Sequence, residues 1–320
     1  MQGYVLRRVI LIVPTLLLVT IIVFGAVRLV PGDVIDLMVA EMASESGMGA
    51  ELDPEYIREM LGLDAPLHVQ YGQWIAKMFR GDLGESLWTQ RAVTEDLINR
   101  IPVSFELGVM ALIIGVVVAI PIGIYSAIRQ DTVGDYFGRS IAIAALSLPN
   151  FWVATMIIVF PSIWWNWSPP VKYIPITEDL TSNLAQFIIP ACIMGMHMSG
   201  GTMRMTRTMM LEVLRQDYIR TAWSKGLKER VVVVRHALKN ALMPVVTQIG
   251  MRLPVMIAGA VILEQIFCLP GIGNLLVQAV NERDYPVISG INLTLATFIL
   301  VANLGVDLTY GYLDPRIHYR

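Results

Sequence analysis

The sequence is poor in charged residues and in the residues that build disulfides or metal sites. Only 16% of its 320 residues are Asp, Glu, Lys or Arg, against roughly 25% in an average soluble domain. The two cysteines, Cys192 and Cys268, stand far apart in apolar surroundings, which fits neither a disulfide framework nor a zinc site. The formal net charge is −2, so the composition gives no support for a nucleic-acid partner.

Motifs of intrinsic catalysis are absent as well. The chain has no G-x-x-x-x-G-K-[ST] phosphate loop, no H-E-x-x-H zinc motif and no G-x-S-x-G nucleophile elbow. The four histidines are scattered, and His197 falls in an apolar stretch, where packing or pore lining is favoured over proton transfer. We therefore expect a protein that is not an enzyme and that holds no cofactor or metal of its own.

Long apolar runs are what the sequence has instead, since 55% of its residues are hydrophobic. A spanning helix needs roughly 20 mostly apolar residues to cross the hydrocarbon core. The first run is too long for the apolar part of a signal peptide, so we interpret it as an uncleaved span. Five spans remain the alternative to six, because Gln186 and Ser199 dilute the fourth run. The six runs are residues 9–30, 105–128, 138–165, 184–205, 244–267 and 287–312.

The distribution of Lys and Arg predicts how these spans are oriented. With the amino terminus inside, the cytoplasmic segments hold 15 of the 24 basic residues, as the positive-inside rule requires. Residues 31–100 carry 13 acidic residues against 5 basic ones. We therefore predict both termini in the cytoplasm. The chain would divide into a first transmembrane helix (1–30), a small extracytoplasmic subdomain (31–100) and a core of five spans (101–320).

The second long polar segment, residues 206–243, is strongly basic and would lie in the cytoplasm. Asp217 is expected to cap a short helix over 218–225, which Gly226 ends in a left-handed conformation. A second helix is expected to begin at Lys228. A basic amphipathic segment of this kind can lie on anionic lipid, but the glycine break between two short helices favours insertion into a partner protein. The apolar positions of the second helix, at helical spacing, are Val231, Val234, Leu238, Ala241 and Leu242.

Ionisable residues at membrane depth are costly and are therefore candidates for function. Glu106 and Glu264 fall near the outer ends of their spans, where a carboxylate that reaches water is the alternative. Arg252 has an alternative too, because its long side chain can reach the headgroups. We take four such residues as candidates for the lining of a translocation path. They are Glu106, Arg252, Glu264 and Asp307.

Short motifs in a fixed order carry a resemblance to a known family. Each is weak alone, but their order and spacing over nearly the whole chain are specific. The chain resembles the permease subunits of bacterial ATP-binding-cassette importers of the dipeptide/oligopeptide (peptide/nickel) class, which have the type I importer fold. The motifs include Arg28-Leu29-Val30-Pro31-Gly32-Asp33, Leu61-Gly62-Leu63-Asp64, Gly81-Asp82-Leu83-Gly84-Glu85-Ser86, Arg235-His236-Ala237-Leu238-Lys239-Asn240-Ala241-Leu242, Pro270-Gly271-Ile272-Gly273 and Leu313-Asp314-Pro315-Arg316.

The resemblance implies a pore-forming subunit of the bacterial inner membrane. Its implied partners are a second, similar permease, two ATPase subunits that bind ATP and Mg²⁺, an extracytoplasmic solute-binding protein and membrane lipid. Di- and oligopeptides are the expected substrates. Nickel, glutathione and oligosaccharides stay open, because the binding protein usually sets selectivity.

The resemblance also implies which residues meet the ATPase. The family's cytoplasmic loop carries a short coupling helix that sits in a cleft of the ATPase, and its counterpart here ends at Gly226. Arg220 replaces the family's glutamate and Thr221 its first alanine. An ion-driven secondary transporter is the alternative, but it needs an inverted repeat and paired acids at mid-membrane, which are not visible. The residues assigned to the ATPase contact are Tyr218, Arg220, Thr221, Ala222, Lys225 and Gly226.

Overall fold

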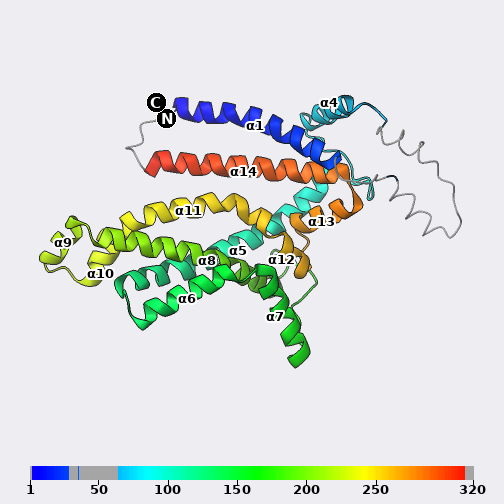
Figure 1. Cartoon of the computed structure of the whole chain (residues 1–320). Coiled ribbons are helices and arrows are strands. Elements are labelled where there is room, and N and C mark those ends of the chain that lie inside the picture. Colours follow the sequence, from blue (N-terminus) through cyan, green and yellow to red (C-terminus); the bar gives the residue numbers. More distant parts are fainter. Residues whose placement is uncertain (1, 29–34, 36–63, 314–320) are drawn as a thin grey trace. The chain divides into compact units, whose positions relative to one another are not determined.

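The computed structural model of the chain describes residues 2–28, 35 and 64–313, with the side chains of 2–9, 253–259 and 307–313 left aside. Within this part, β-type pairing is confined to one bridge between Glu85 and Ala92. The expected all-α fold is therefore confirmed (Figure 1). The helices are α1 (Gln2–Arg28), α4 (Leu67–Met78), α5 (Val93–Ile128), α6 (Val133–Ser147), α7 (Asn150–Trp165), α8 (Leu180–Leu214), α9 (Asp217–Ser224), α10 (Glu229–Val231), the π-helix η1 (Val232–Ala237), α11 (Leu238–Gly259), α12 (Val261–Ile266), α13 (Ile272–Glu282) and α14 (Tyr285–Leu313).

Several of these helices are long and apolar enough to cross a membrane. Among the described residues they are α1, α5, α8 and α14, and the α6–α7 pair meets the same criterion if it is counted as one span. The fifth predicted span falls on α11 and α12. These helices agree with a polytopic membrane protein of about six spans.

The third predicted span, residues 138–165, is not one straight helix. α6 and α7 are bent by 94° at the break between them. Pro149 has no amide hydrogen to continue the helix, and its ring disfavours the helical region for the residue before it. Leu148 accordingly lies in the extended region, with φ −87° and ψ 125°.

The chain forms two compact units, and each has a hydrophobic core of its own. The first unit comprises Met1–Pro102, Gly271–Leu304 and Ile317–Arg320, and the second comprises Val103–Pro270 and Gly305–Arg316. Helices α5 and α14 each contribute residues to both units.

In the first unit, α1, the start of α5, α13 and α14 share one apolar cluster. Asp284 caps α14, because its Oδ1 accepts a hydrogen bond from the Val287 amide and its Oδ2 accepts one from the Ser86 hydroxyl at 2.6 Å. This carboxyl is buried, and burial raises its pKa above the ordinary value despite these hydrogen bonds. The polar link fastens the 81–92 loop to the start of α14.

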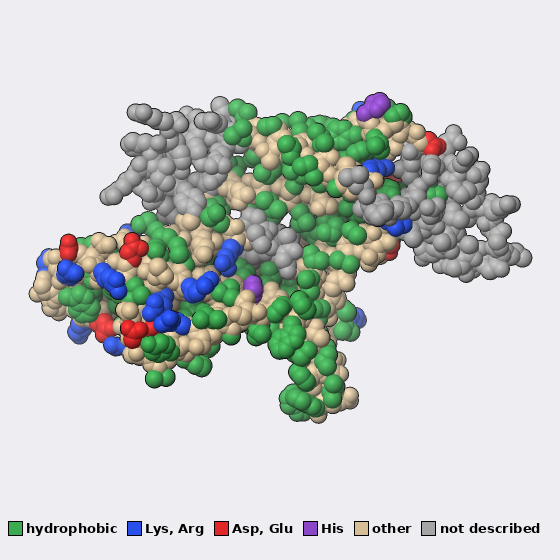
Figure 2. All heavy atoms as spheres, in the orientation of Figure 1, with side chains coloured by type: hydrophobic (Ala, Val, Ile, Leu, Met, Phe, Trp, Pro, Cys, Tyr) green, Lys and Arg blue, Asp and Glu red, His purple; other side chains and the backbone are tan. Residues whose placement is uncertain are grey.

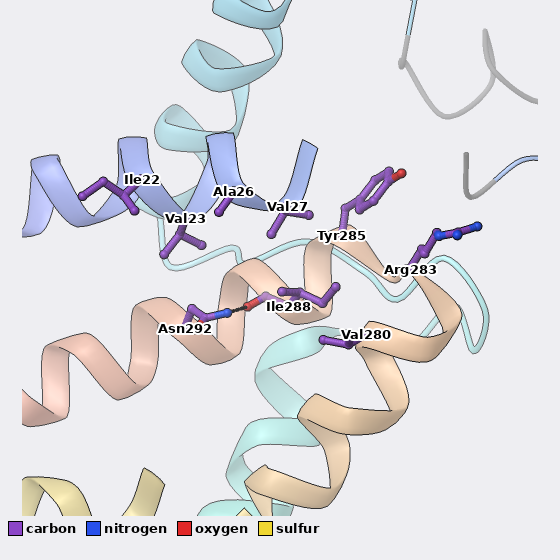
Figure 3. Close-up of a pocket in the computed structure, with 9 residues that line it drawn as sticks. All are labelled: Ile22, Val23, Ala26, Val27, Val280, Arg283, Tyr285, Ile288 and Asn292. Atoms are coloured by element: carbon purple, nitrogen blue, oxygen red, sulfur yellow. Dashed lines mark hydrogen bonds between the residues drawn. The ribbon is translucent and has the colours of Figure 1, made fainter. Parts of the chain in front are cut away.

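A crevice of about 340 Å³ also lies in the first unit, between α1 and α14 (Figure 3). Its lining is mostly aliphatic, and Arg283 and Tyr285 stand at one end of it. The Asn292 amide donates to the Ile288 carbonyl of its own helix. The crevice therefore lacks the convergent polar groups that fix the orientation of a charged solute.

In the second unit, α8 packs against both α6 and α11, and its glycines let neighbouring backbones approach closely. A methyl carbon built at Gly200 would lie 2.6 Å from the Ala142 carbonyl oxygen of α6. One built at Gly195 would lie 2.7 Å from the Ala111 carbonyl oxygen of α5. Side chains at these positions are excluded by the neighbouring backbone, so α8 meets α5 and α6 through its own backbone.

Candidate coupling helix and buried polar residues

Helix α9 begins one residue earlier than the sequence predicts. Gln216 occupies the N-cap position, and its side chain makes no capping hydrogen bond. The predicted cap, Asp217, is instead the first helical residue. Its carboxylate lies 3.5 Å from the Arg220 guanidinium, and its negative charge is stabilised by the positive end of the helix dipole. The prediction of Asp217 as the cap was wrong by one position.

Gly226 ends the α9 turn as the sequence predicts. Its φ is +73°, in the left-handed region that favours glycine. Its amide donates to the Trp223 carbonyl at 2.9 Å, so a carbonyl of the last turn is satisfied. A methyl carbon built at Gly226 would meet nothing within 4 Å. Within the described chain, the requirement for glycine is therefore conformational and not steric.

One face of α9 is buried in an apolar cluster that we call the coupling cluster. Ile219 is fully buried and Ala222 nearly so. Partly buried residues at the end of α5, Ile124 and Ile128 among them, pack against this cluster. The cluster therefore joins α9 to the ends of α5 and α8 and to the start of α11. Its buried members are Ala127, Met210, Ile219, Ala222, Val232, Val233, Ala237 and Ala241.

The remaining surface of α9 is exposed and carries both aromatic and cationic groups. Tyr218 and Trp223 are 44% and 45% exposed. The Tyr218 hydroxyl accepts a hydrogen bond from the Asn240 amide of α11 at 2.9 Å, which orients the ring. Arg220, Thr221 and the Lys225–Gly226 turn are exposed on the same short helix. The sequence analysis did not include Trp223 among the predicted contact residues, although it directly follows Ala222, which is one of them.

The apolar face of the helix after α9 differs from the predicted one. Val231 and Val234 were expected inside but are 37% and 56% exposed. Val232 and Val233 are buried in their place. The cause is the π-helix η1, whose i→i+5 hydrogen bonds add one residue to the turn and rotate the following positions. A regular helical period therefore assigns the wrong valines to the core.

The surface around α9 and α10 is rich in charge, whereas α7 presents mostly hydrophobic side chains (Figure 2). A basic end next to apolar helices is the pattern expected of a segment at the membrane surface. The exposed basic residues of this part of the chain are Arg215, Arg220, Lys225, Lys228, Arg230, Arg235 and Lys239.

An ion pair that the sequence analysis did not identify links α6 to α8. The Arg207 guanidinium donates to both carboxylate oxygens of Asp135, each at 2.9 Å. Asp135 is fully buried, and it also accepts a hydrogen bond from the Asp131 amide. Its 72-residue separation from Arg207 left no local sequence signal. The pair lies in the same unit as the coupling cluster.

The structure places the predicted path residues at separate points of the second unit. The Arg252 guanidinium donates to the Met198 carbonyl of α8 at 3.3 Å and packs against Gly201. Glu264 is fully buried and accepts a hydrogen bond from Ser104 at 2.6 Å. It is therefore not the interfacial carboxylate that the sequence left as an alternative.

The other two path residues do not join these groups. Glu106 is half-buried and contacts the side chain of Asn183 in α8. The side chain of Asp307 lies outside the described residues. No group of three or more His, Cys, Asp or Glu that could hold a metal ion occurs among the residues whose side chains are described.

Comparison with known families covers nearly the whole chain. Residues 119–319 match the family described as "Binding-protein-dependent transport system inner membrane component". Residues 1–108 match the family described as "Binding-prot-dependent transport system membrane comp, N-term".

Curated relatives match over their full length. The chain is 39% identical to a putative peptide transport system permease protein of Brucella suis, over all of both chains. It is 37% identical to the dipeptide transport system permease protein DppB of Escherichia coli and 36% identical to the oligopeptide transport system permease protein AppB of Bacillus subtilis, again over all of both chains.

A solved structure is similar in fold. It is the crystal structure of an amino acid ABC transporter with histidines, with a TM-score of 0.50, and the match covers 70% of this chain and 95% of that one. The sequence identity is 15%, so this likeness concerns the fold alone.

Proposed function

This chain belongs to the family of binding-protein-dependent transport system inner membrane components, and on that premise we propose that it carries short peptides inward, driven by partner ATPases. As a permease of an ABC importer it forms the membrane pore. Di- and oligopeptides are proposed because the full-length relatives are named for peptides, dipeptides and oligopeptides. Nickel, glutathione and oligosaccharides remain the alternatives within the same importer type.

The coupling cluster is the observation that carries the mechanism. The buried face of α9 is packed on the ends of α5 and α8 and on the start of α11. A displacement of α9 is thereby transmitted to three long helices, because a close-packed cluster moves as one body. We propose that an ATPase subunit binds the exposed face of α9 through Tyr218, Arg220, Thr221, Lys225 and Gly226, with Ala222 holding the helix from inside.

The proposed complex contains this chain, a second permease of the same kind, two ATPases that bind ATP and Mg²⁺, and an extracytoplasmic solute-binding protein. The basic surface around α9 favours a cytoplasmic position for this end of the second unit. Both termini are then cytoplasmic as well.

Co-purification is the test of this proposal. A tagged chain extracted from its native membrane in mild detergent should bring down a second permease and Walker-motif ATPases, identified by mass spectrometry. The same complex in proteoliposomes should take up a dipeptide only with ATP. A chain recovered alone that moves solute under an ion gradient would overturn the proposal and favour a secondary transporter.

Substitutions at Gly226 test whether the ATPase comes close to this turn. Asparagine tolerates the left-handed conformation, so Gly226→Asn should retain α9, whereas Gly226→Val should distort it. If the turn faces only solvent, we expect the asparagine variant to transport peptide at the wild-type rate. If the partner packs on the glycine, as we propose, both variants should lose most ATP-driven uptake while inserting normally into the membrane. Uptake by both variants at the wild-type rate would remove Gly226 from the interface.

A further inference from the structure

Helix α4 is fixed against the carboxyl-terminal end of α1 by a cluster of aromatic rings. The Phe24 ring of α1 lies 5.4 Å from the Tyr71 ring and 6.0 Å from the Trp74 ring, measured between centroids. The Tyr71 hydroxyl shares a hydrogen bond of 2.9 Å with the Thr20 hydroxyl. Arg28 is the last residue of α1, and its guanidinium carbon lies 4.9 Å from the centroid of the Phe24 ring. This guanidinium is therefore held beside a packed aromatic surface.

This end of α1 belongs at a boundary of the membrane. The candidate span of α1 is Ile10–Arg28, and that of α14 is Tyr285–Val306. The end of the first span meets the beginning of the second, because the Arg28 guanidinium carbon lies 5.1 Å from the centroid of the Tyr285 ring. Tyrosine and tryptophan at the ends of spans are typical of the headgroup level. The surroundings of Arg28 therefore lie at the level of the lipid headgroups.

A hollow of about 250 Å³ with polar lining lies at this level, beside Arg28. Lys77 of α4 also lines it, is exposed, and makes no ion pair with another described residue. The exposed Glu85 is the only carboxylate among the described residues that line the hollow. Guanidinium and ammonium groups are common ligands of phosphate in proteins. Two cations and one carboxylate thus fit a headgroup that has a phosphate and an amine.

The aliphatic crevice between α1 and α14 adjoins this hollow. Val27 and Tyr285 line both of them. Figure 3 shows Tyr285 at one end of the crevice, with Ile22 and Val23 farther along α1. The crevice therefore runs from the headgroup level toward the membrane interior. Its volume of about 340 Å³ is within the range of ligand pockets, and its aliphatic lining favours a hydrocarbon chain.

We propose that this end of α1 binds one glycerophospholipid, with its phosphate on Arg28 and Lys77 and one acyl chain in the crevice between α1 and α14. Such a lipid joins an anionic group at the headgroup level to hydrocarbon at membrane depth, and basic pockets between transmembrane helices bind lipid headgroups. Glu85 can accept hydrogen bonds from an ethanolamine ammonium group, so phosphatidylethanolamine is the probe that fits the hollow. The site takes lipid and not solute, so it does not depend on which solute the importer carries.

Photolabelling of the wild-type complex tests which occupant fills the crevice. The complete complex, purified from its native membrane, is placed in vesicles that contain phosphatidylethanolamine with a diazirine on one acyl chain. Peptide mapping after illumination should find the label concentrated on the crevice residues of α1 and α14. A diacylglycerol with the same labelled chain has no phosphate and should label them at least about tenfold less, as expected for loss of charged hydrogen bonds.

Three outcomes of this labelling would overturn the proposal. The first is equal labelling by the two lipids, which would remove the phosphate contact. The second is label spread evenly over the exposed face of residues 10–18 of α1. The third is a crevice without label, as expected if a helix of the second permease fills it.

Two charge reversals near the end of α4 test the headgroup contact. Lys77→Glu removes a cation from the hollow, so labelling of the crevice by phosphatidylethanolamine should fall at least about tenfold. Arg80→Glu makes the same change of charge at an exposed residue that does not line the hollow, and it should label like the wild type. Equal losses in both variants would mean that only the general surface charge matters, and would contradict the proposal.

A bulky residue in the crevice tests the acyl-chain contact. Ala26 is exposed and lines the crevice, so Ala26→Trp should fill the space and reduce the labelling of α14 to a similar extent. Leu18→Trp is the matched control, because Leu18 is 57% exposed on the same helix and does not line the crevice. Unchanged labelling in Ala26→Trp would contradict the proposal. If a variant does not assemble with its partners, the comparison of the two lipids on the wild-type complex decides.

Discussion

Replacing Ile219 by aspartate is expected to abolish ATP-driven transport while the chain still inserts into the membrane. Ile219 is fully buried at the centre of the coupling cluster. An unpaired carboxylate there costs several kcal/mol, roughly what a buried charge without a partner costs after relaxation. α9 should therefore detach from the bundle. We expect the ATPases to be lost on co-purification. Uptake should fall by at least about a hundredfold, because each 1.4 kcal/mol corresponds to roughly a factor of ten.

The same charge on a nearby exposed valine is the matched control. Val234 is 56% exposed and is not among the buried members of the coupling cluster, so Val234→Asp should transport peptide at close to the wild-type rate. If Ile219→Asp retains its ATPases and its uptake, α9 does not transmit motion through this cluster.

Replacing Asp135 by leucine is expected to cost about 3–5 kcal/mol of stability, the typical penalty for removing one partner of a buried ion pair. The reason is that Arg207, whose side chain is 18% exposed, would keep its charge with no carboxylate to accept its two hydrogen bonds. Unfolding of the purified chain, followed by circular dichroism against denaturant in mixed micelles, measures this loss.

A double variant shows whether the loss is due to the unpaired charge. Asp135→Leu combined with Arg207→Met removes both charges and should recover most of the stability, because an apolar pair of similar volume often replaces a buried ion pair without loss. Arg129→Gln is the surface control. Its partner Glu229 lies 3.7 Å away and both side chains are about half exposed, so we expect a change below about 1 kcal/mol. Equal losses in the single and double variants would mean that leucine does not fit the site.

The sequence predicts the spans and the Gly226 turn well, because both depend on local chemistry. A run of about 20 apolar residues has few alternatives to a spanning helix, and glycine after a short helix favours a left-handed end. The break at Pro149 was open to prediction on the same grounds, since proline restricts the residue before it. The N-cap position is occupied by Gln216 and not by the predicted Asp217, a difference of one residue that is usual at helix ends.

The features that the sequence did not predict depend on three-dimensional packing. The π-helix η1 inverts the burial of four consecutive valines, and a period of 3.6 residues cannot represent it. The Asp135–Arg207 pair joins residues on different helices. The placement of Glu106 beside Asn183 requires knowing which faces of α5 and α8 meet.

The backbone contacts of α8 at Gly195 and Gly200 have a consequence for tolerance to mutation. Every substitution of a glycine adds atoms, and at these two positions the first added carbon already collides with a carbonyl oxygen of α5 or α6. Neither residue carries a functional group, so neither stands out by its chemistry. A saturation scan of transport should nevertheless rank both among the least replaceable positions of the chain, beside Ile219 and above the exposed cations of α9.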